Sequence, residues 1–484
     1  MSGPLGASQF MYSTGAGAFY DHQIEQSLRF SANNSGTSSR LYRTYGTVSS
    51  QTAFTFSMWV KRGRATIEDN IWQVFFDSNG SSQNGDNSGF YFKRYGDALQ
   101  IDAHISGGGT STASNEIFRD PTAWYHLILQ NNSNVATVYM NNVLVTWGGA
   151  VTCFPLDNGT DKTRIGSRND GYYPFEGYIA DVQLVDGSVV APSSFAEEHD
   201  DTGQWVPKKY VGSYGSNGFH LTFEDNSGTT ATTLGKDSSG NGNNFTPNNF
   251  SVASGAANDS VTDTPTNNYC VLNEATENLG GAGVNCLSDG NLKYTGTLNN
   301  DNIVGTMSVS SGKWYYEVIC GANPDKLIAG WTTVDELSNW NESALIYYNS
   351  AGIRDGNSTM QWDTDVTTSL TFATNDVIGF ALNLTDNELK VYENNSLVST
   401  ITIPTDKGDT WLPCVGDSSA TDAICTVNFG QQGFTHTPPT GFSSLCSNNL
   451  PTPTIKNPSE YFNTGLYTGT GSSNAITGLG FQPD

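Results

Sequence analysis

The stretch from Phe54 to Lys61 has the sequence FTFSMWVK, and it decides the fold class. Its even positions, which include Phe56, Met58 and Val60, are all apolar, and its odd positions are mostly polar. Successive side chains of a strand point to opposite faces, so this period of two gives the strand one apolar face. The stretch therefore predicts a β-strand packed with one face on a core.

Further strand-like stretches occur along the rest of the chain. In the N-terminal half they are expected at 71–76, 89–93, 124–130, 137–140, 143–147 and 177–185. In the C-terminal half they are expected at 313–320, 327–331, 369–372, 376–383, 388–393, 398–403, 411–415 and 424–429. Asn, Gly, Asp and Ser separate them, which is typical of all-β proteins. Only one short helix is expected, of one or two turns at 193–199 after Pro192.

One hairpin pattern occurs in both halves of the chain. Residues 138–145 and 391–398 share the pattern V-Y-x-N-N-x-L-V. Asn tolerates positive φ angles, so an Asn-Asn pair can close a tight turn between two strands. The repeat indicates that both halves are built on similar antiparallel sheets.

The composition excludes several classes of protein. The chain has 484 residues, of which 36% are hydrophobic and 14% charged, with 52 Gly and 17 Pro. This apolar content is enough for packed cores, and the length favours two to four domains. The net charge of −25 disfavours binding to nucleic acid or to an anionic membrane surface.

The cysteines and the N-terminus bear on the cell compartment. The number of cysteines is odd, and no C-x-x-C pair occurs, so neither a disulfide scaffold nor a zinc site is indicated. The first seventeen residues lack the features of a secretory signal, and no apolar run is long enough to span a bilayer. A reducing compartment is therefore expected for assembly of the protein. The cysteines are Cys153, Cys270, Cys286, Cys320, Cys414, Cys425 and Cys446.

Six motifs in the first half carry a family resemblance. They are QSLRF (26–30), FTFSMWVKR (54–62), WYHL (124–127), IGS (165–167), FEGYIADV (175–182) and WVPKKY (205–210). With these motifs, residues 20–225 resemble the laminin-G/concanavalin-A-like modules found in structural proteins of marine bacteriophages. The resemblance implies a two-sheet jelly-roll sandwich.

Five motifs in the second half resemble a different family. They are SGKWYYEV (311–318), AGW (329–331), DVIGFALNL (376–384), VNFGQ (427–431) and PTGF (439–442). This part looks like a SPRY domain, which is also a jelly-roll sandwich. The resemblances imply an all-β chain of two concanavalin-A-like jelly-roll β-sandwiches in tandem.

The expected domain organisation has five parts. Residues 1–19 form an extended N-terminal arm, 20–225 the laminin-G/concanavalin-A-like sandwich, and 267–445 the SPRY-like sandwich. Residues 226–266 are rich in Gly, Asn and Ser and are expected to be a partly extended connection with few buried residues. Residues 446–484 are a C-terminal tail that docks on a neighbouring subunit, or the start of a further module in a longer protein.

Catalysis is not indicated by the acidic or histidine residues. Sandwich glycosidases need two carboxylates facing one groove, about 5–5.5 Å or 6.5–9.5 Å apart. No predicted strand has acids at the required alternate positions: Glu317 stands alone, and Asp335 and Glu336 are adjacent. The six histidines are scattered, without a metalloprotease or nucleophile-elbow motif. The chain is expected not to be an enzyme.

One loop has the composition of a cation site. Asp237, Asn241 and Asn243 lie in the loop DSSGNGN, and Asp225 precedes it. Calcium prefers such oxygen ligands, so these four residues are candidate ligands for a possible Ca²⁺. The alternative is an Asn/Gly turn that satisfies its own backbone groups. No other cofactor is indicated.

Aromatic residues supply candidates for ligand contact. Trp340, Tyr347, Tyr348 and Trp362 lie among small polar residues, a composition that suits adaptable contact surfaces and stacking on sugar rings. In contrast, strand patterns assign Trp59, Trp124, Trp147, Trp314 and Tyr316 to sheet packing, and Trp331 to the core. A small aromatic island in the N-terminal arm, Phe10, Met11 and Tyr12, is the candidate for anchoring in the virion.

The resemblances give the functional expectation. They imply a non-enzymatic bacteriophage virion protein, a tail or capsid fibre on the virion surface, that contacts host glycan. It would assemble in the host cytoplasm and be released by lysis, so it needs no signal peptide. The expected partners are other virion proteins through the N-terminal arm, host glycan, and copies of itself, with a trimer favoured. Alternatives are a structural spacer or decoration protein and, less favoured, a polysaccharide depolymerase.

Overall fold

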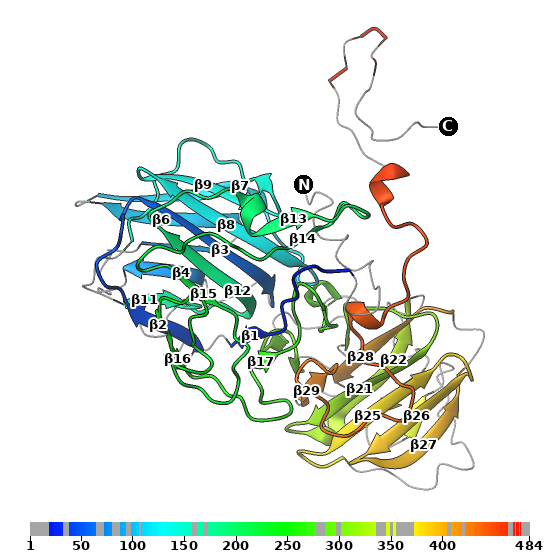
Figure 1. Cartoon of the computed structure of the whole chain (residues 1–484). Coiled ribbons are helices and arrows are strands. Elements are labelled where there is room, and N and C mark those ends of the chain that lie inside the picture. The colour runs from blue at the N-terminus through cyan, green and yellow to red at the C-terminus, as the bar shows by residue number, and fades with distance from the viewer. Residues whose placement is uncertain are drawn as a thin grey trace.

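The computed structural model shows two β-rich modules joined side by side (Figure 1). It describes residues 19–31, 38–63, 72–79, 88–92, 98–105, 108–156, 162–168, 173–276, 286–296, 302–334, 345–348, 352–354, 372–403, 408–417, 422–462, 468–469, 471–473 and 475. Each module consists of two main sheets, and the strand pairs within them are antiparallel. The predicted all-β fold with tandem sandwiches is confirmed.

The first module packs sheet A on sheet B. Sheet A has the order β10 (Val143–Leu144), β9 (Val135–Met140), β8 (Trp124–Asn132), β3 (Ala53–Arg62), β12 (Gly177–Asp186), β1 (Ser27–Phe30) and β17 (Ser260–Val261), with β15 (Phe219–Leu221) paired to β12. Sheet B has the order β16 (Thr246–Asn248), β2 (Arg40–Thr44), β11 (Lys162–Ile165), β4 (Gln73–Asn79), β5 (Ser88–Phe92), β6 (Ala98–Ile105) and β7 (Gly108–Ile117). A separate hairpin pairs β13 (Ala196–Glu198) with β14 (Trp205–Pro207).

The second module packs sheet C on sheet D. Sheet C has the order β18 (Leu287–Ser288), β19 (Lys293–Thr295), β29 (Ile424–Asn428), β21 (Lys313–Cys320), β25 (Val377–Asn383), β26 (Glu388–Glu393) and β27 (Ser396–Thr402). Sheet D has the order β20 (Asn302–Val304), β28 (Trp411–Asp417), β22 (Leu327–Thr333), β23 (Leu345–Tyr348) and β24 (Gly352–Arg354). The 3₁₀ turns of the described residues are η3 (Pro192–Ser194), η4 (Glu274–Thr276), η5 (Pro324–Lys326), η8 (Ser447–Asn449) and η9 (Pro458–Glu460).

Strand β3 has the predicted alternation, and both of its faces are buried. Its even-numbered apolar residues lie in the core between sheets A and B. Trp59, on the opposite face, lies in a different apolar cluster that continues into the second module. Trp124 and Tyr178 of the neighbouring strands β8 and β12 belong to the same cluster. Both faces of sheet A are therefore covered, one by sheet B and the other partly by the second module and partly by Phe195 and Trp205 at the β13–β14 hairpin.

The aromatic core of the second module centres on Tyr316. Its ring lies 5.2 Å from the Phe380 ring and 5.4 Å from the Trp331 ring. The assignment of Trp59, Trp124, Trp314, Tyr316 and Trp331 to packing is confirmed, since all of them are buried. Trp147 is only partly buried against the first core.

Both predicted Asn-Asn turns are present. Asn141 and Asn142 have φ angles of 47° and 65°, and Asn394 and Asn395 have φ angles of 46° and 68°. The first pair joins β9 to β10, and the second joins β26 to β27. Two successive positive φ angles give a turn whose twist matches that of the flanking strands, which is why Asn is used there.

Two expectations from the sequence are wrong in detail, and a third lies mostly outside the described residues. The helix expected at 193–199 is the single turn η3 followed by strand β13, because residues 196–198 pair with β14. The connection 226–266 is not poorly buried: Phe245 and Val261 are fully buried, and β16 and β17 extend sheets B and A. Of the strand expected at 369–372, only Phe372 is among the described residues.

A polar network at the centre of the module contact ties the connection to both modules. The Lys61 ammonium donates to Asp263 Oδ2 at 2.8 Å, to Asn268 Oδ1 at 2.7 Å and to the Tyr269 carbonyl at 2.8 Å. Trp124 Nε1 donates to Asp263 Oδ1 at 3.0 Å. The Lys61 and Asp263 side chains are both fully buried. Every polar group of this pair has a partner, as a buried ion pair requires.

Candidate functional site

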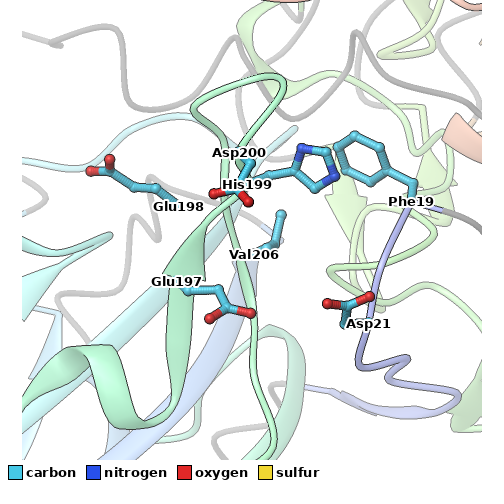
Figure 2. Close-up of a pocket in the computed structure, with 7 residues that line it drawn as sticks. All are labelled: Phe19, Asp21, Glu197, Glu198, His199, Asp200 and Val206. Atoms are coloured by element: carbon cyan, nitrogen blue, oxygen red, sulfur yellow. The ribbon is translucent and has the colours of Figure 1, made fainter.

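A cavity of about 330 Å³ lies where the start of the described chain passes the hairpin of β13 and β14 (Figure 2). Its size is at the lower end of the usual range for small-molecule sites, about 300–1,000 Å³. The cavity brings together residues almost 180 positions apart in sequence. Its lining consists of Phe19, Asp21, Glu197, Glu198, His199, Asp200 and Val206.

An aromatic pair forms one wall of the cavity. The rings of Phe19 and His199 stack with centroids 4.1 Å apart and an interplanar angle of 14° (Figure 2). Phe19 is held in place because it belongs to a small buried cluster with Tyr20 and Val206. Burial raises the pKa of Tyr20 to about 12, against the opposing effect of a hydrogen bond with Gln204, so its hydroxyl stays protonated.

The hairpin positions the polar residues of the cavity. The backbone amide of His199 donates to the Gln204 carbonyl at 2.8 Å, which closes the hairpin beyond β13. The Nδ1 atom of His199 accepts from the Asp201 amide at 3.3 Å, which orients the imidazole ring. Because side chains alternate along β13, Glu198 points away from Glu197 and Asp21 (Figure 2).

The cavity is acidic, and one of its carboxylates has a cationic partner. Glu197 accepts from Lys208 Nζ at 2.7 Å, whereas Glu198 and Asp200 are exposed to solvent. Carboxylate oxygens accept hydrogen bonds from hydroxyl groups, and a stacked aromatic pair offers an apolar face. The combination suits a small polyhydroxylated ligand with one apolar face. Among the described residues, the structure shows no apolar pocket around any of these carboxylates of the kind that raises the pKa of a general acid.

A Ser–His pair behind the hairpin is not a nucleophile. Ser57 Oγ lies 2.9 Å from His126 Nε2, and Trp205 Nε1 donates to His126 Nδ1 at 3.0 Å. The indole can only donate, so Nδ1 carries the lone pair and Nε2 donates its proton to Ser57. Burial lowers the pKa of His126 to about 3, which keeps the ring neutral. An imidazole that donates a hydrogen bond to the serine hydroxyl cannot accept the proton of that hydroxyl. His126 therefore does not activate Ser57, and the two side chains serve in packing.

An Asp–His pair occupies a bulge in β12. Asp181 has a φ of 49°, and its Oδ1 lies 2.5 Å from His220 Nε2. Burial alone would raise the pKa of Asp181, but the charge and hydrogen bond of His220 outweigh it and lower the pKa. Burial alone would lower the pKa of His220, but Asp181 outweighs it and raises the pKa. The ion pair therefore stabilises the fold.

This pair predicts a pH dependence of stability. The histidine contribution is complete below the unfolded pKa of about 6.5 and is lost as the pH rises through the raised folded pKa. The aspartate contribution is complete above about pH 4 and is lost as the pH falls through the lowered pKa. We expect the melting temperature of His220→Asn to fall furthest below that of the wild type between about pH 4 and 6.5. A difference that stays constant from pH 5 to pH 9 would contradict this.

The candidate calcium loop is a hydrogen-bonded turn. Asp237 Oδ1 accepts from the amides of His220 and Ser239, each at 2.9 Å, and Oδ2 accepts from the Asn243 amide at 2.8 Å. The side-chain amide of Asn241 donates to the carbonyls of Gly215 and Gly218. Asp225 accepts instead from Ser227 in its own turn. Within the described residues no group of three or more His, Cys, Asp or Glu is placed to hold a metal.

Whether this loop binds calcium has a direct test. Because both Asp237 oxygens already accept backbone amides, we expect the same melting temperature with excess calcium as with chelator. A calcium-dependent rise that Asp237→Asn abolishes would contradict this and assign a cation to the loop.

Of the other residues singled out from the sequence, only two are among the described residues. Trp340 and Trp362 lie outside the described residues, as do the arm residues Phe10, Met11 and Tyr12. Tyr347 and Tyr348 lie on β23, paired with β22 and β24.

The cavity was not predicted from the sequence. Phe19 was assigned to the boundary of the arm, and His199 was counted among scattered histidines. The run EEHD at 197–200, next to the motif at 205–210, is the signal that marks this hairpin as polar. Nothing in the sequence indicates that Phe19 stacks on it.

The comparisons with known proteins agree with the fold of the first module. Residues 33–192 match the family model of the concanavalin A-like lectin/glucanases superfamily. The first module therefore contains a concanavalin A-like domain, as the sequence motifs indicated. No curated protein matches the chain. Within the described residues, no helix has the length and apolar character needed to cross a lipid bilayer.

Three solved structures are similar at 14% identity each. The SPRY domain of human HERC1 has a TM-score of 0.25 and covers 28% of this chain and 87% of its own. A heptameric SAP-like pentraxin from Limulus polyphemus has a TM-score of 0.27 and covers 35% and 80%. A putative carbohydrate binding protein from Bacteroides ovatus has a TM-score of 0.33 and covers 47% and 59%.

Proposed function

We propose that this chain is a non-enzymatic virion protein of a bacteriophage that binds a host-surface glycan in the cavity of Figure 2. The observation that carries the glycan proposal is the stacked Phe19–His199 pair beside carboxylates in a cavity of about 330 Å³. The concanavalin A-like domain supports it, since this fold occurs in lectins. The phage assignment rests on the sequence motifs. As a virion protein it would assemble in the host cytoplasm and be displayed on the particle.

The sugar would stack on the aromatic pair, and its hydroxyl groups would donate hydrogen bonds to Asp21 and Glu197. Lys208 would hold the Glu197 carboxylate in place while the ligand binds. Binding rather than bond cleavage is proposed because Asp21 is exposed and Glu197 is paired with Lys208, so neither lies in an apolar pocket.

Glycan-array binding by the full chain tests this proposal. We expect Phe19→Ala and His199→Ala to weaken binding of the glycan that the wild type selects. Phe462→Ala is the control, because Phe462 is a 72% exposed aromatic outside the cavity. If the wild type selects no glycan, or if the cavity variants bind as well as the control, the proposal is wrong. Turnover of a bound polysaccharide would favour the depolymerase alternative.

A structural spacer is the second candidate function. The buried Lys61–Asp263 network favours it, together with the apolar cluster shared by both modules, because such a contact restricts their relative motion. In this case the N-terminal arm with Phe10, Met11 and Tyr12 would attach the unit to other virion proteins, as a trimer. Deletion of residues 1–18 tests the arm: loss of particle incorporation with unchanged glycan binding would assign the two tasks to separate parts.

A further inference from the structure

Arg168 is a buried cation whose hydrogen-bonding capacity is unused. It follows strand β11 on the first module, and its side chain is only 1% exposed. Its Nε and both terminal nitrogens are buried, and within the described part of the chain none of them has a hydrogen-bond partner. A guanidinium has five N–H donors, and no other side chain among the described residues has as many buried nitrogens without a partner.

Three aromatic rings surround the guanidinium. The ring centroids of Trp72, Tyr91 and Tyr173 lie 5.5 Å, 5.7 Å and 5.7 Å from the central carbon of the guanidinium. Trp72 and Tyr173 pack on each other at 4.9 Å and are half-buried, whereas Tyr91 on β5 is buried. The rings stabilise the positive charge through cation–π contacts. They do not accept hydrogen bonds from the N–H groups, which lie in the plane of the guanidinium.

The nearest carboxylate does not satisfy Arg168. Asp102 Oδ2 lies 3.9 Å from its terminal nitrogen, beyond hydrogen-bond distance. The other oxygen, Oδ1, accepts from Gln100 Nε2 at 2.9 Å. In contrast, the buried Arg29 bonds Asp259 through two nitrogens, at 2.9 Å and 3.1 Å. The same fold thus pairs another buried arginine fully and leaves Arg168 open.

Arg168 differs from the two cations that precede it on β11. The Lys162 ammonium lies 4.5 Å from the centroid of the Tyr42 ring. Arg164 is neutralised by Asp77 at 3.3 Å. The planar fork of Arg168 matches two oxygens of a carboxylate or sulfate, and such charge-assisted bonds are strong where water is excluded. The half-buried Trp72 and Tyr173 rings offer a face for the sugar that carries the anion.

We propose that Arg168, with Trp72, Tyr91 and Tyr173, forms a subsite for an oxyanion carried by an acidic saccharide. The group is a ring carboxylate or a sugar sulfate. The subsite lies beyond the end of β11 and beside β5 of sheet B, whereas the cavity of Figure 2 lies at the hairpin of β13 and β14. It therefore goes beyond the proposed function, and the two can fail separately.

Titration calorimetry with the full chain tests the subsite. The probes are methyl glucuronide, glucose 6-sulfate, neutral methyl glucoside and inorganic sulfate. At least one of the charged sugars is expected to bind, and which one identifies the anion; methyl glucoside and inorganic sulfate are expected to bind more weakly. Arg168→Met should weaken binding of the charged sugar by about tenfold to a hundredfold. Arg119→Met, at an exposed arginine of the same module, should leave it unchanged. His199→Ala should also leave binding of the charged sugar at this subsite unchanged, even where it weakens glycan binding in the cavity of Figure 2.

A second variant covers failure of Arg168→Met to fold. Tyr173→Ala removes a half-buried ring and keeps the guanidinium, so it should weaken the charged sugar but not inorganic sulfate. The proposal is overturned if neither charged sugar binds, if Arg168→Met binds as the wild type does, or if inorganic sulfate binds as tightly as the sugar sulfate.

Discussion

Replacing Lys61 by Met is expected to lower the free energy of unfolding by about 3–5 kcal/mol. The substitution keeps much of the volume of the side chain but removes three hydrogen bonds, to Asp263, Asn268 and the Tyr269 carbonyl. Asp263 would remain as a fully buried carboxylate without its counter-ion. Because this network links the first module to the connection, the loss should also weaken the contact between the modules.

Denaturant unfolding monitored by tryptophan fluorescence measures this effect. Lys208→Met is the matched control, because Lys208 also pairs with a carboxylate at 2.7 Å but is 45% exposed. Exposed pairs contribute at most about 1 kcal/mol. If Lys61→Met costs no more than Lys208→Met, the buried network is not what holds this part of the fold. Adding Asp263→Asn to Lys61→Met should recover part of the loss, since the carboxylate charge is then removed as well.

Replacing Glu317 by Ala is expected to cost about 2–4 kcal/mol, because buried donors lose their acceptor. Glu317, which the sequence shows without a second acid at alternate spacing, is fully buried on β21. Its carboxylate accepts from the amides of Thr435 and His436, each at 2.8 Å, and from Asn428 Nδ2 at 3.2 Å. The carboxylate therefore fixes the segment after β29 against sheet C.

Hydrogen exchange of the segment after β29, with the unfolding free energy, measures the effect of Glu317→Ala. The Thr435 and His436 amides should exchange faster in the variant, and the exchange of β3 in the first module should not change. Glu388→Ala is the control, since Glu388 lies on the same sheet but forms an exposed pair with Lys390 at 3.0 Å. Unchanged exchange at Thr435 and His436 would show that Glu317 does not fix this segment.

Most of the strands were predictable because their signal is local. The alternation in FTFSMWVK determines β3, and strands β21 and β26 have the predicted bounds. The Asn-Asn pairs determine their turns, since positive φ angles are a property of a few residue types. Strand β6 was missed although Leu99, Ile101 and Ala103 alternate along it and lie in the core. Strand β7 was missed because residues 108–117 are largely small or polar, and sheet pairing supplies what their composition does not.

The candidate site was less predictable, because it depends on contacts between distant parts of the chain. The aromatic residues proposed from the sequence were chosen by local composition. The stacking of Phe19 on His199, in contrast, forms only when the first module folds. In the same way, composition described 226–266 as a polar connection. The segment is polar, but some of its polar side chains are buried because they have partners elsewhere in the fold, as Asp263 has in Lys61.

The sequence by itself determined the all-β class, most strands, the two Asn-Asn turns and the residues that fill the cores, because each follows from the chemistry of neighbouring residues. Only the tertiary structure decided which polar residues are buried with partners, which ring lies on which, and that Arg168 is left with unused donors. The physical reason is that burial removes water as a partner, and what replaces it comes from residues far away in the sequence.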